Sequence, residues 1–194
     1  MKKNSVELKH LFNPFLKYSE QKLLVTSLLG WIMLNVSCVM FNHKMNGLLH
    51  FSTHNNSWLD SLKTTNIVLI INLLSFYILG KIINRKTRFI DIFNAILVGI
   101  IPLVLILGIG EIPIFANALE KVAHSAYQLE NFSEMKWELM LVAISSLIIL
   151  PLLVYAITLM FNGFRVATNS KNGLHIALFF IVLFILNSIT QFYF

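Results

Sequence analysis

Four asparagines interrupt long apolar stretches of the sequence, and they are the first candidates for chemistry: Asn35, Asn72, Asn94 and Asn187. A polar side chain among apolar neighbours is costly unless it is hydrogen bonded. Such an amide either joins two helices, at about 1 kcal/mol per bond, or lines a polar cavity for a substrate or a lipid headgroup. The first role is the simpler interpretation. The cavity stays open as an alternative, above all for Asn72 and Asn94.

One carboxylate and two prolines stand out beside these asparagines. Asp91 opens the third apolar stretch, three residues after Arg88. A carboxylate is stabilised at a helix N-terminus and can pair with nearby bases, so cap and ion pair are expected, with proton transfer as the alternative. Pro102 and Pro151 each remove a backbone donor in the middle of an apolar stretch. They should bend their helices, which shapes the packing or creates a hinge.

The histidines offer a weaker case for metal or acid–base chemistry. His50 and His54 have the four-residue spacing of metal ligands on a helix, but Asn55, Asn56 and Ser57 follow and indicate a loop. An enzyme would need His50, His54, Glu111 and His124 to converge on one substrate. No nucleophile, phosphate-binding or metalloprotease motif is present. We therefore expect no enzymatic activity, no bound metal and no cofactor.

The composition indicates a membrane protein. Of the 194 residues, 57% are hydrophobic and 12% are charged, against about 25% charged in an ordinary soluble domain. The mean hydropathy is +0.74. So few polar residues could not cover a soluble core. Cys38 is the single cysteine, which excludes an intrachain disulfide.

Five apolar stretches are long enough to cross a bilayer, which takes about 20 residues of helix. They are 23–41, 65–83, 90–110, 139–161 and 174–193. The expected fold is therefore an all-α, five-helix transmembrane domain over 23–194. Residues 1–22 precede it as a cytoplasmic amphipathic segment.

The distribution of Lys and Arg predicts the orientation. Eleven of the fifteen fall in the N-terminal segment and in the second and fourth connections, and four fall in the other two connections. Because cytoplasmic loops are enriched in these residues, the N-terminus is expected in the cytoplasm and the C-terminus outside. The net charge of +6 is explained in this way, so no nucleic-acid partner is expected.

Local patterns predict helices and caps outside the spans. The apolar residues of the N-terminal segment share a helical face, with Asn13 as cap, Pro14 at the first helical position, and a helix that could run on into the first span. A short outer helix is expected over 113–129. Two further caps are expected, Ser57 with Asp60 and Asn131 with Glu134. The apolar face consists of Leu8, Leu11, Phe12, Phe15 and Leu16.

Three short motifs resemble bacterial members of the Yip family, the membrane proteins that interact with Ypt/Rab GTPases. They are Asn162-Gly163-Phe164-Arg165-Val166-Ala167-Thr168-Asn169, Asn13-Pro14-Phe15, and the turn from Gly80-Lys81 to Asp91. The resemblance covers nearly the whole chain in span number, topology and loop lengths. It implies a compact five-span bundle in a bacterial cytoplasmic membrane. The chain lacks the Asp-Leu-Tyr-Gly-Pro tract of eukaryotic relatives, so GTPase binding is not implied.

Two functions follow as hypotheses. The first is a non-enzymatic membrane-organising, trafficking-like or assembly component, with anionic lipids and a membrane protein or a second copy as partners. The second is a small transporter or channel, with a polar pathway between helices 2, 3 and 4 lined by Asn72, Asn94, Pro102 and Pro151. The cytoplasmic contacts expected for the first are Arg85, Lys86, Arg88, Arg165 and Lys171.

Overall fold

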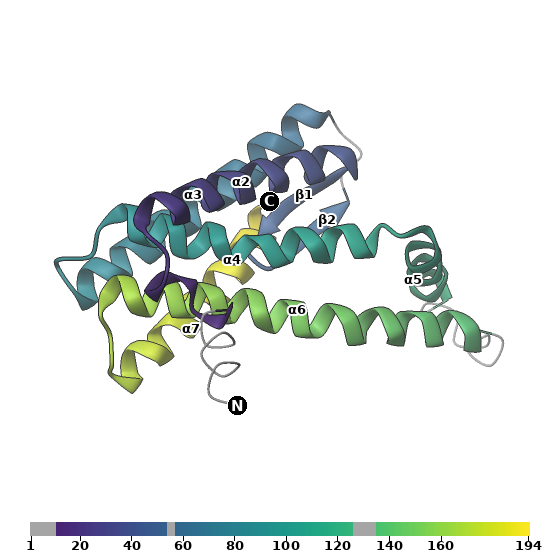
Figure 1. Cartoon of the computed structure of the whole chain (residues 1–194). Helices are drawn as coiled ribbons and strands as arrows, with labels where there is room; N and C mark the ends of the chain where they lie inside the picture. The colour runs from purple at the N-terminus through teal and green to yellow at the C-terminus, as the bar shows by residue number, and fades with distance from the viewer. Residues whose placement is uncertain (1–10, 54–56, 126–134) are drawn as a thin grey trace.

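The computed structural model describes residues 11–53, 57–125 and 135–194, and it is a helical bundle with one β-hairpin (Figure 1). Five of its helices are long and apolar enough to cross a membrane, as expected. The elements in chain order are η1 Pro14–Leu16, α2 Glu20–Met40, β1 His43–Gly47, β2 His50–Thr53, α3 Trp58–Ile83, α4 Phe89–Gly110, α5 Pro113–Ser125, α6 Lys136–Thr168 and α7 Gly173–Tyr193.

Two spanning helices extend well beyond their apolar stretches. α3 begins at Trp58 instead of residue 65, and α6 continues to Thr168, so the connection expected from residue 162 is still helical. Hydropathy marks the part of a helix that suits hydrocarbon, whereas the backbone stays helical as long as its own hydrogen bonds close. α6 ends where Asn169 takes a left-handed conformation, with φ 51°. Ser170 N then donates to Arg165 O in a Schellman-type cap.

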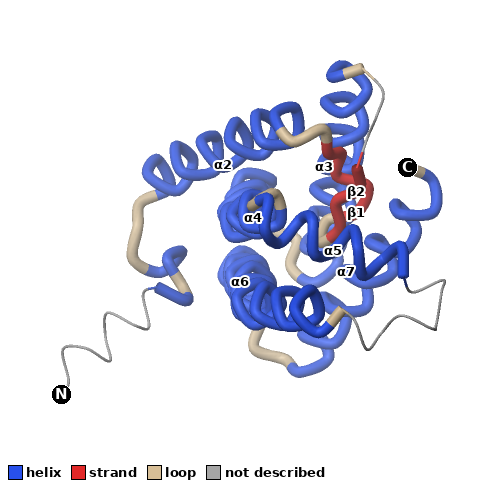
Figure 2. The backbone as a smooth tube through the Cα atoms, turned by 90° about the vertical axis from the view of Figure 1, so that its right-hand side faces the viewer, coloured by secondary structure: helices blue, strands red, loops and turns tan. Residues whose placement is uncertain are grey.

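The expectation of an all-α fold was incomplete, because the first connection contains an antiparallel hairpin. β1 pairs with β2 from His43↔Thr53 to Gly47↔His50, with an irregularity after Met45. Met45 and Leu48 are fully buried in the main core. The hairpin therefore packs into the bundle, beside α3 and α7 (Figure 2). Its short strands show no alternation of apolar and polar residues, which is why the sequence did not predict them.

Side chains from the helices satisfy the backbone of this hairpin. The Thr65 hydroxyl of α3 accepts a hydrogen bond from Met45 N at 3.1 Å. Asn187 Oδ1 of α7 accepts one from Leu49 N at 3.0 Å, and Ser61 Oγ donates to His43 O. Non-helical backbone inside a membrane protein is tolerated only when such partners exist. Asn187 thus joins two elements, as predicted, with a strand segment rather than a helix as its partner.

α4 is the central helix of the bundle. Twelve of its 22 residues are buried, and it lies between α2 and α6 (Figure 2). The buried residues of α2 recur at helical spacing and face α4, with Gly30 against Leu97 and Ile101. Across the α4–α6 contact, Gly99 faces Met160 and Ala156, and Gly163 faces Ala95. Small residues let helix backbones approach closely in a membrane.

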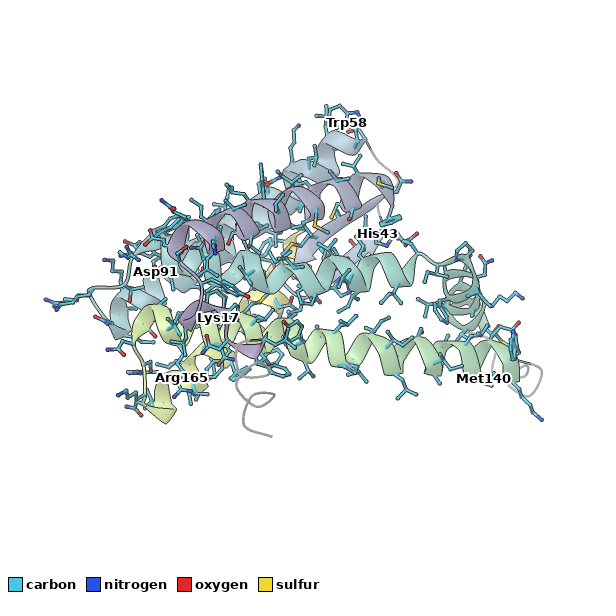
Figure 3. The ribbon with its side chains drawn as sticks, viewed as in Figure 1. Lys17, His43, Trp58, Asp91, Met140 and Arg165 are labelled. Carbon is cyan, nitrogen blue, oxygen red and sulfur yellow. The ribbon has the colours of Figure 1, made fainter. Side chains whose placement is uncertain are left out.

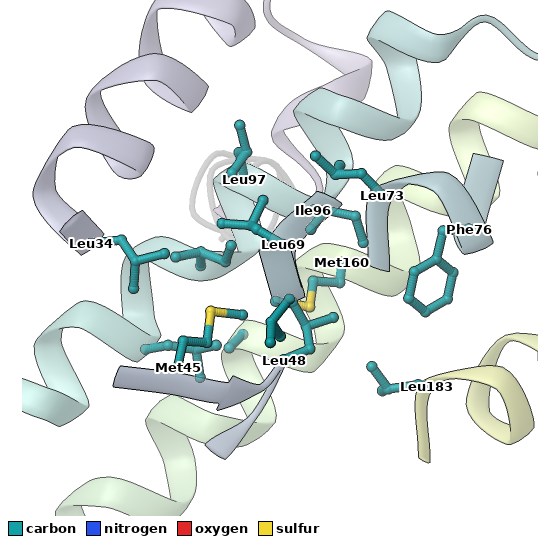
Figure 4. Close-up of a cluster of buried hydrophobic side chains, with 14 of the residues drawn as sticks. Leu34, Met45, Leu48, Leu69, Leu73, Phe76, Ile96, Leu97, Met160 and Leu183 are labelled. Atoms are coloured by element: carbon teal, nitrogen blue, oxygen red, sulfur yellow. The ribbon is translucent and has the colours of Figure 1, made fainter. Parts of the chain in front are cut away.

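Aromatic rings fill the junction of α3, α6 and α7. Phe76 of α3, Phe164 of α6 and Phe179 of α7 have ring centroids 5.1 to 5.9 Å apart. Edge and offset ring contacts of this kind add to the area that they bury. This cluster continues into the aliphatic core drawn in Figure 4. Many other large apolar residues are exposed on the outer faces of the helices, as a hydrocarbon solvent allows.

The short elements agree in part with the sequence patterns. η1 begins at Pro14, as predicted, but Asn13 forms no side-chain cap and η1 does not continue into α2, which starts anew at Glu20. α5 begins at Pro113, and its expected last residues, 126–129, lie outside the described residues. Leu8 and the pair Asn131 and Glu134 also lie outside them. Ser57 caps α3 in position, although its hydroxyl donates to the Asp60 carboxylate.

We expect Gly163→Ala to destabilise the protein. A Cβ at this position would lie 2.6 Å from Ala95 Cβ, 2.8 Å from Ala95 Cα and 2.8 Å from Phe15 Cζ. Overpacking against backbone costs about 1–3 kcal/mol, more than the ~1 kcal/mol that alanine gains over glycine in a helix. The midpoint of thermal unfolding in detergent should fall. Gly108→Ala is the matched control, because nothing lies within 4 Å of its added Cβ. Equal midpoints for the two variants would contradict the close α4–α6 contact.

Candidate functional site

Arg88 ties the start of α2 to the start of α4. Its Nε and Nη2 donate to Asp91 Oδ2 and Oδ1 at 3.0 and 2.8 Å, and Nη2 lies 2.8 Å from Glu20 Oε2. The hydrogen bonds to Asp91, and then those to Glu20, raise the pKa of Arg88 above its ordinary value, so the guanidinium stays charged. The ion pair expected for Asp91 is present. Arg88 thus holds both carboxylates in this clamp, while its side chain stays 59% exposed, so its expected contact with lipid stays a prediction.

Asn94 lies three residues after Asp91, about one helical turn further into the bundle. It is 2% exposed, and its Oδ1 accepts a hydrogen bond from Ser27 Oγ of α2 at 2.9 Å. This bond confirms the predicted role of joining helices. Asn94 Nδ2 donates no hydrogen bond to the described residues. Asn94 also lines a cavity. Both roles that the sequence left open therefore meet in this one side chain.

Residues 11–19, here called the N-terminal strap, cross from α2 to α6. Tyr155 Oη donates to Leu11 O at 3.1 Å, and Asn162 Nδ2 donates to Phe12 O at 2.8 Å. The rings of Phe12 and Tyr155 meet edge to face at 5.6 Å. Leu11 and Phe12 are helical and Asn13 is not, so these two carbonyls lie at a helix end, where the backbone offers them no partner. The two bonds from α6 satisfy them.

Three adjoining cavities lie beneath and beside the strap, and Tyr18 lines all of them. The first, about 330 Å³, is polar, and its charged lining residues are Glu20, Arg88 and Asp91. The other two, about 410 and 490 Å³, are mainly apolar and share Pro14 and Val98. Each falls in the size range of small-molecule sites. An ionic chamber that opens beside two apolar ones suits an amphiphile.

The predicted cytoplasmic bases gather at one end of the bundle, here called the basic end. It holds the start of α2, the α3–α4 turn and the α6–α7 turn, and Figure 3 places Asp91 and Arg165 there, far from Trp58 and Met140. The side chains of Arg85, Lys86, Arg165 and Lys171 are exposed. Arg165 also donates through Nε to Ser170 O at 3.2 Å.

The residues proposed for a transport pathway are dispersed. Asn72 is fully buried and donates to Val68 O of its own helix, with its Oδ1 unpaired. It lines none of the three cavities at the strap. Pro102 lines the 410 Å³ cavity, whereas Pro151 lies on an exposed face of α6. α4 and α6 both remain helical through their prolines.

The outer histidines that the structure describes do not form one cluster. His50 pairs with Asn46, and His124 lies 3.9 Å from Glu120 on α5. Glu111 lies 3.4 Å from His43 Nε2. His54 is outside the described residues. Within the described ranges no three metal-ligating side chains come together.

Sequence reasoning missed several residues of this site, among them Glu20, Tyr18, Tyr155 and Asn162. No periodicity marks them, because their partners lie far away along the chain. One signal in the sequence pointed to this region: Asn13-Pro14-Phe15 and the stretch that begins at Asn162 are two of the motifs that resemble the Yip family. The structure brings these two motifs together, with Asn162 on Phe12 and Gly163 against Phe15.

No protein-family model, curated protein or solved structure matches this chain. These comparisons leave the resemblance to the Yip family as a prediction.

We expect Asn162→Leu to loosen the strap. Losing a hydrogen bond of this kind costs about 0.5–1.5 kcal/mol, so the amide protons of Lys17 and Tyr18, which bond to Pro14 O, should exchange roughly two- to tenfold faster. Mass spectrometry of hydrogen exchange in detergent would measure this. Thr158→Val is the control, because among the described residues the Thr158 hydroxyl bonds only to Val154 O of its own helix. Unchanged protection in Asn162→Leu would show that this bond does not hold the strap.

Proposed function

We propose that the chain is a non-enzymatic integral membrane protein whose basic end faces the cytoplasm and binds anionic lipid headgroups. It would organise or assemble other membrane components from there. The observation that carries the proposal is the asymmetry of charge between the two ends of the bundle.

Among the described residues, the basic end holds eight Lys and Arg and two acidic residues. The opposite end holds four of each. Both acidic residues of the basic end, Glu20 and Asp91, are neutralised in part by Arg88. The other Lys and Arg residues of the basic end can therefore interact with a negatively charged membrane surface. Juxtamembrane bases of this kind attract anionic lipids by about 1 kcal/mol each.

The same asymmetry supports a cytoplasmic N-terminus, since cytoplasmic loops carry the excess of Lys and Arg. A bacterial cytoplasmic membrane and a protein partner, either another membrane protein or a second copy, are proposed from the resemblance to the Yip family. The exposed outer faces of α6 and α7 leave room for such a partner. The transport alternative gains no support from the geometry, because Asn72 and Asn94 do not share a cavity among the described ones.

The orientation can be tested with single cysteines in a Cys38→Ser background, since Cys38 is the only native cysteine. We expect Lys171→Cys to resist a membrane-impermeant maleimide in intact cells and to react after the cells are lysed. Lys63→Cys, at the opposite end, should react in intact cells. The reverse pattern would overturn the cytoplasmic placement of the basic end.

The lipid preference can be tested with Arg85→Gln, Lys86→Gln and Lys171→Gln combined. Native mass spectrometry from mixed bilayers of phosphatidylglycerol and phosphatidylcholine would count the lipids that the protein retains. We expect the wild type to retain phosphatidylglycerol preferentially and the triple variant to lose most of this preference, because about 1 kcal/mol of attraction disappears with each base. Arg165 stays in place because it binds the end of α6.

The matched control neutralises three bases of the opposite end, with Lys63→Gln, Lys121→Gln and Lys136→Gln. It should keep the phosphatidylglycerol preference. A triple variant of the basic end that retains as much phosphatidylglycerol as this control would contradict the proposed function.

A further inference from the structure

We propose that the three cavities at the strap form one binding site for a diacyl phospholipid with a primary-amine headgroup, of the phosphoethanolamine class. This site is distinct from the exposed bases of the basic end, although it deepens the proposed function by naming a specific lipid. The argument rests on charge, on the order of residues along α4 and on an unpartnered amide.

The charge of the polar cavity calls for a cation. Its lining holds two carboxylates, Glu20 and Asp91, and one guanidinium, Arg88. The lining therefore has one more negative charge than positive charge. Arg88 engages Oε2 of Glu20 and leaves Oε1 as an acceptor. A primary ammonium group carries three donors and one positive charge, which fits two carboxylates that already share one guanidinium.

The apolar cavities carry the complementary charge at their rims. Lys17 lines one of them and Lys22 lines the other. A phosphate between the amine and the acyl chains would therefore lie between two bases. Lys side chains can reach such a group while their stems cover apolar surface. A headgroup of positive amine and negative phosphate thus matches the alternation of charge around Tyr18.

The residues of α4 follow the order of groups in a phospholipid. Arg88, Asp91, Asn94 and Val98 are spaced by three or four positions and so lie along one face, which passes from charge to amide to hydrocarbon. Asn94 is one turn deeper than Asp91. Its Oδ1 is held by Ser27, so Nδ2 is left to donate to a phosphate or ester oxygen.

The two apolar chambers supply places for two acyl chains. Both begin at Pro14, Tyr18 and Val98 and then diverge. One continues along α4 and α6, past Pro102 and Leu159. The other follows α2, past Val25 and Thr26. A single-chain amphiphile would leave one of the two chambers empty.

The test is a competition among lipids that differ only in the headgroup. Detergent-purified full-length protein would be mixed with equimolar phosphatidylethanolamine, its N,N-dimethyl derivative, phosphatidylcholine and phosphatidylglycerol with identical acyl chains. Native mass spectrometry would count the bound lipids. We expect one tightly held phosphatidylethanolamine, weaker retention of the dimethyl lipid, and least of phosphatidylcholine, because N–H donors disappear in that order.

Two variants test the two parts of the site. Glu20→Gln with Asp91→Asn should lower the retention of phosphatidylethanolamine by about tenfold and spare phosphatidylglycerol. Val98→Phe should fill the mouth of both apolar chambers and displace the lipid, while the ion pairs of Arg88 with Glu20 and Asp91 stay intact. This variant still tests the site if the double variant fails to fold. Glu120→Gln, an exposed carboxylate on α5, is the matched control and should bind as the wild type does.

Equal retention of all four lipids, insensitive to these variants, would overturn the proposal and leave only a nonspecific apolar groove. Retention of phosphatidylglycerol that is lost in the Arg85, Lys86 and Lys171 variant, with no tightly held phosphatidylethanolamine, would also overturn this proposal, yet it would support the proposed function. Selective retention of phosphatidylethanolamine with no preference for phosphatidylglycerol at the basic end would support this site alone. The two proposals therefore fail separately.

Discussion

Backbone polar groups outside the helices need partners, because a bilayer offers them no water, and much of this structure follows from that constraint. Two segments that lie outside the spanning helices are packed against them. The β1–β2 hairpin takes its partners from Ser61, Thr65 and Asn187, and the strap takes its partners from Tyr155 and Asn162. Several polar residues of the spanning helices thus serve segments distant in sequence. Their presence in apolar stretches has a structural cause that does not require a transport pathway.

The close approach of α4 to its neighbours is the second determinant of the fold. Hydrophobic burial gives little preference for one helix pairing over another in lipid, so shape and small residues decide it. Gly30, Gly99 and Gly163 stand at the contacts of α4 with α2 and α6. The same approach brings Asn94 to Ser27 and aligns Arg88 with Glu20. Packing at the centre of the bundle therefore builds the ionic cavity at its basic end.

The basic end combines two kinds of electrostatic feature. Arg88, Glu20 and Asp91 form an ion-pair network in which the charges compensate one another in part. Arg85, Lys86 and Lys171 are exposed around it. Exposed bases act over roughly a Debye length on any anionic surface, whereas the cavity can discriminate by hydrogen-bond geometry. A membrane-organising protein could use the first for general attachment and the second for one lipid.

The sequence by itself determined the five spanning helices, the gathering of Lys and Arg in alternate connections, and the helix-joining role of Asn94. These follow from hydropathy and composition, which act locally along the chain. Only the tertiary structure decided that Arg88 bridges Glu20 and Asp91, that Asn72 bonds within its own helix, and that the first connection is a buried hairpin. These features depend on side-chain partners from 3 to 138 positions away, or on strand pairing that no alternation of apolar and polar residues predicts. The cavities at the strap arise in the same way, because Tyr18 meets Val98 and Tyr155 only after α2, α4 and α6 have packed.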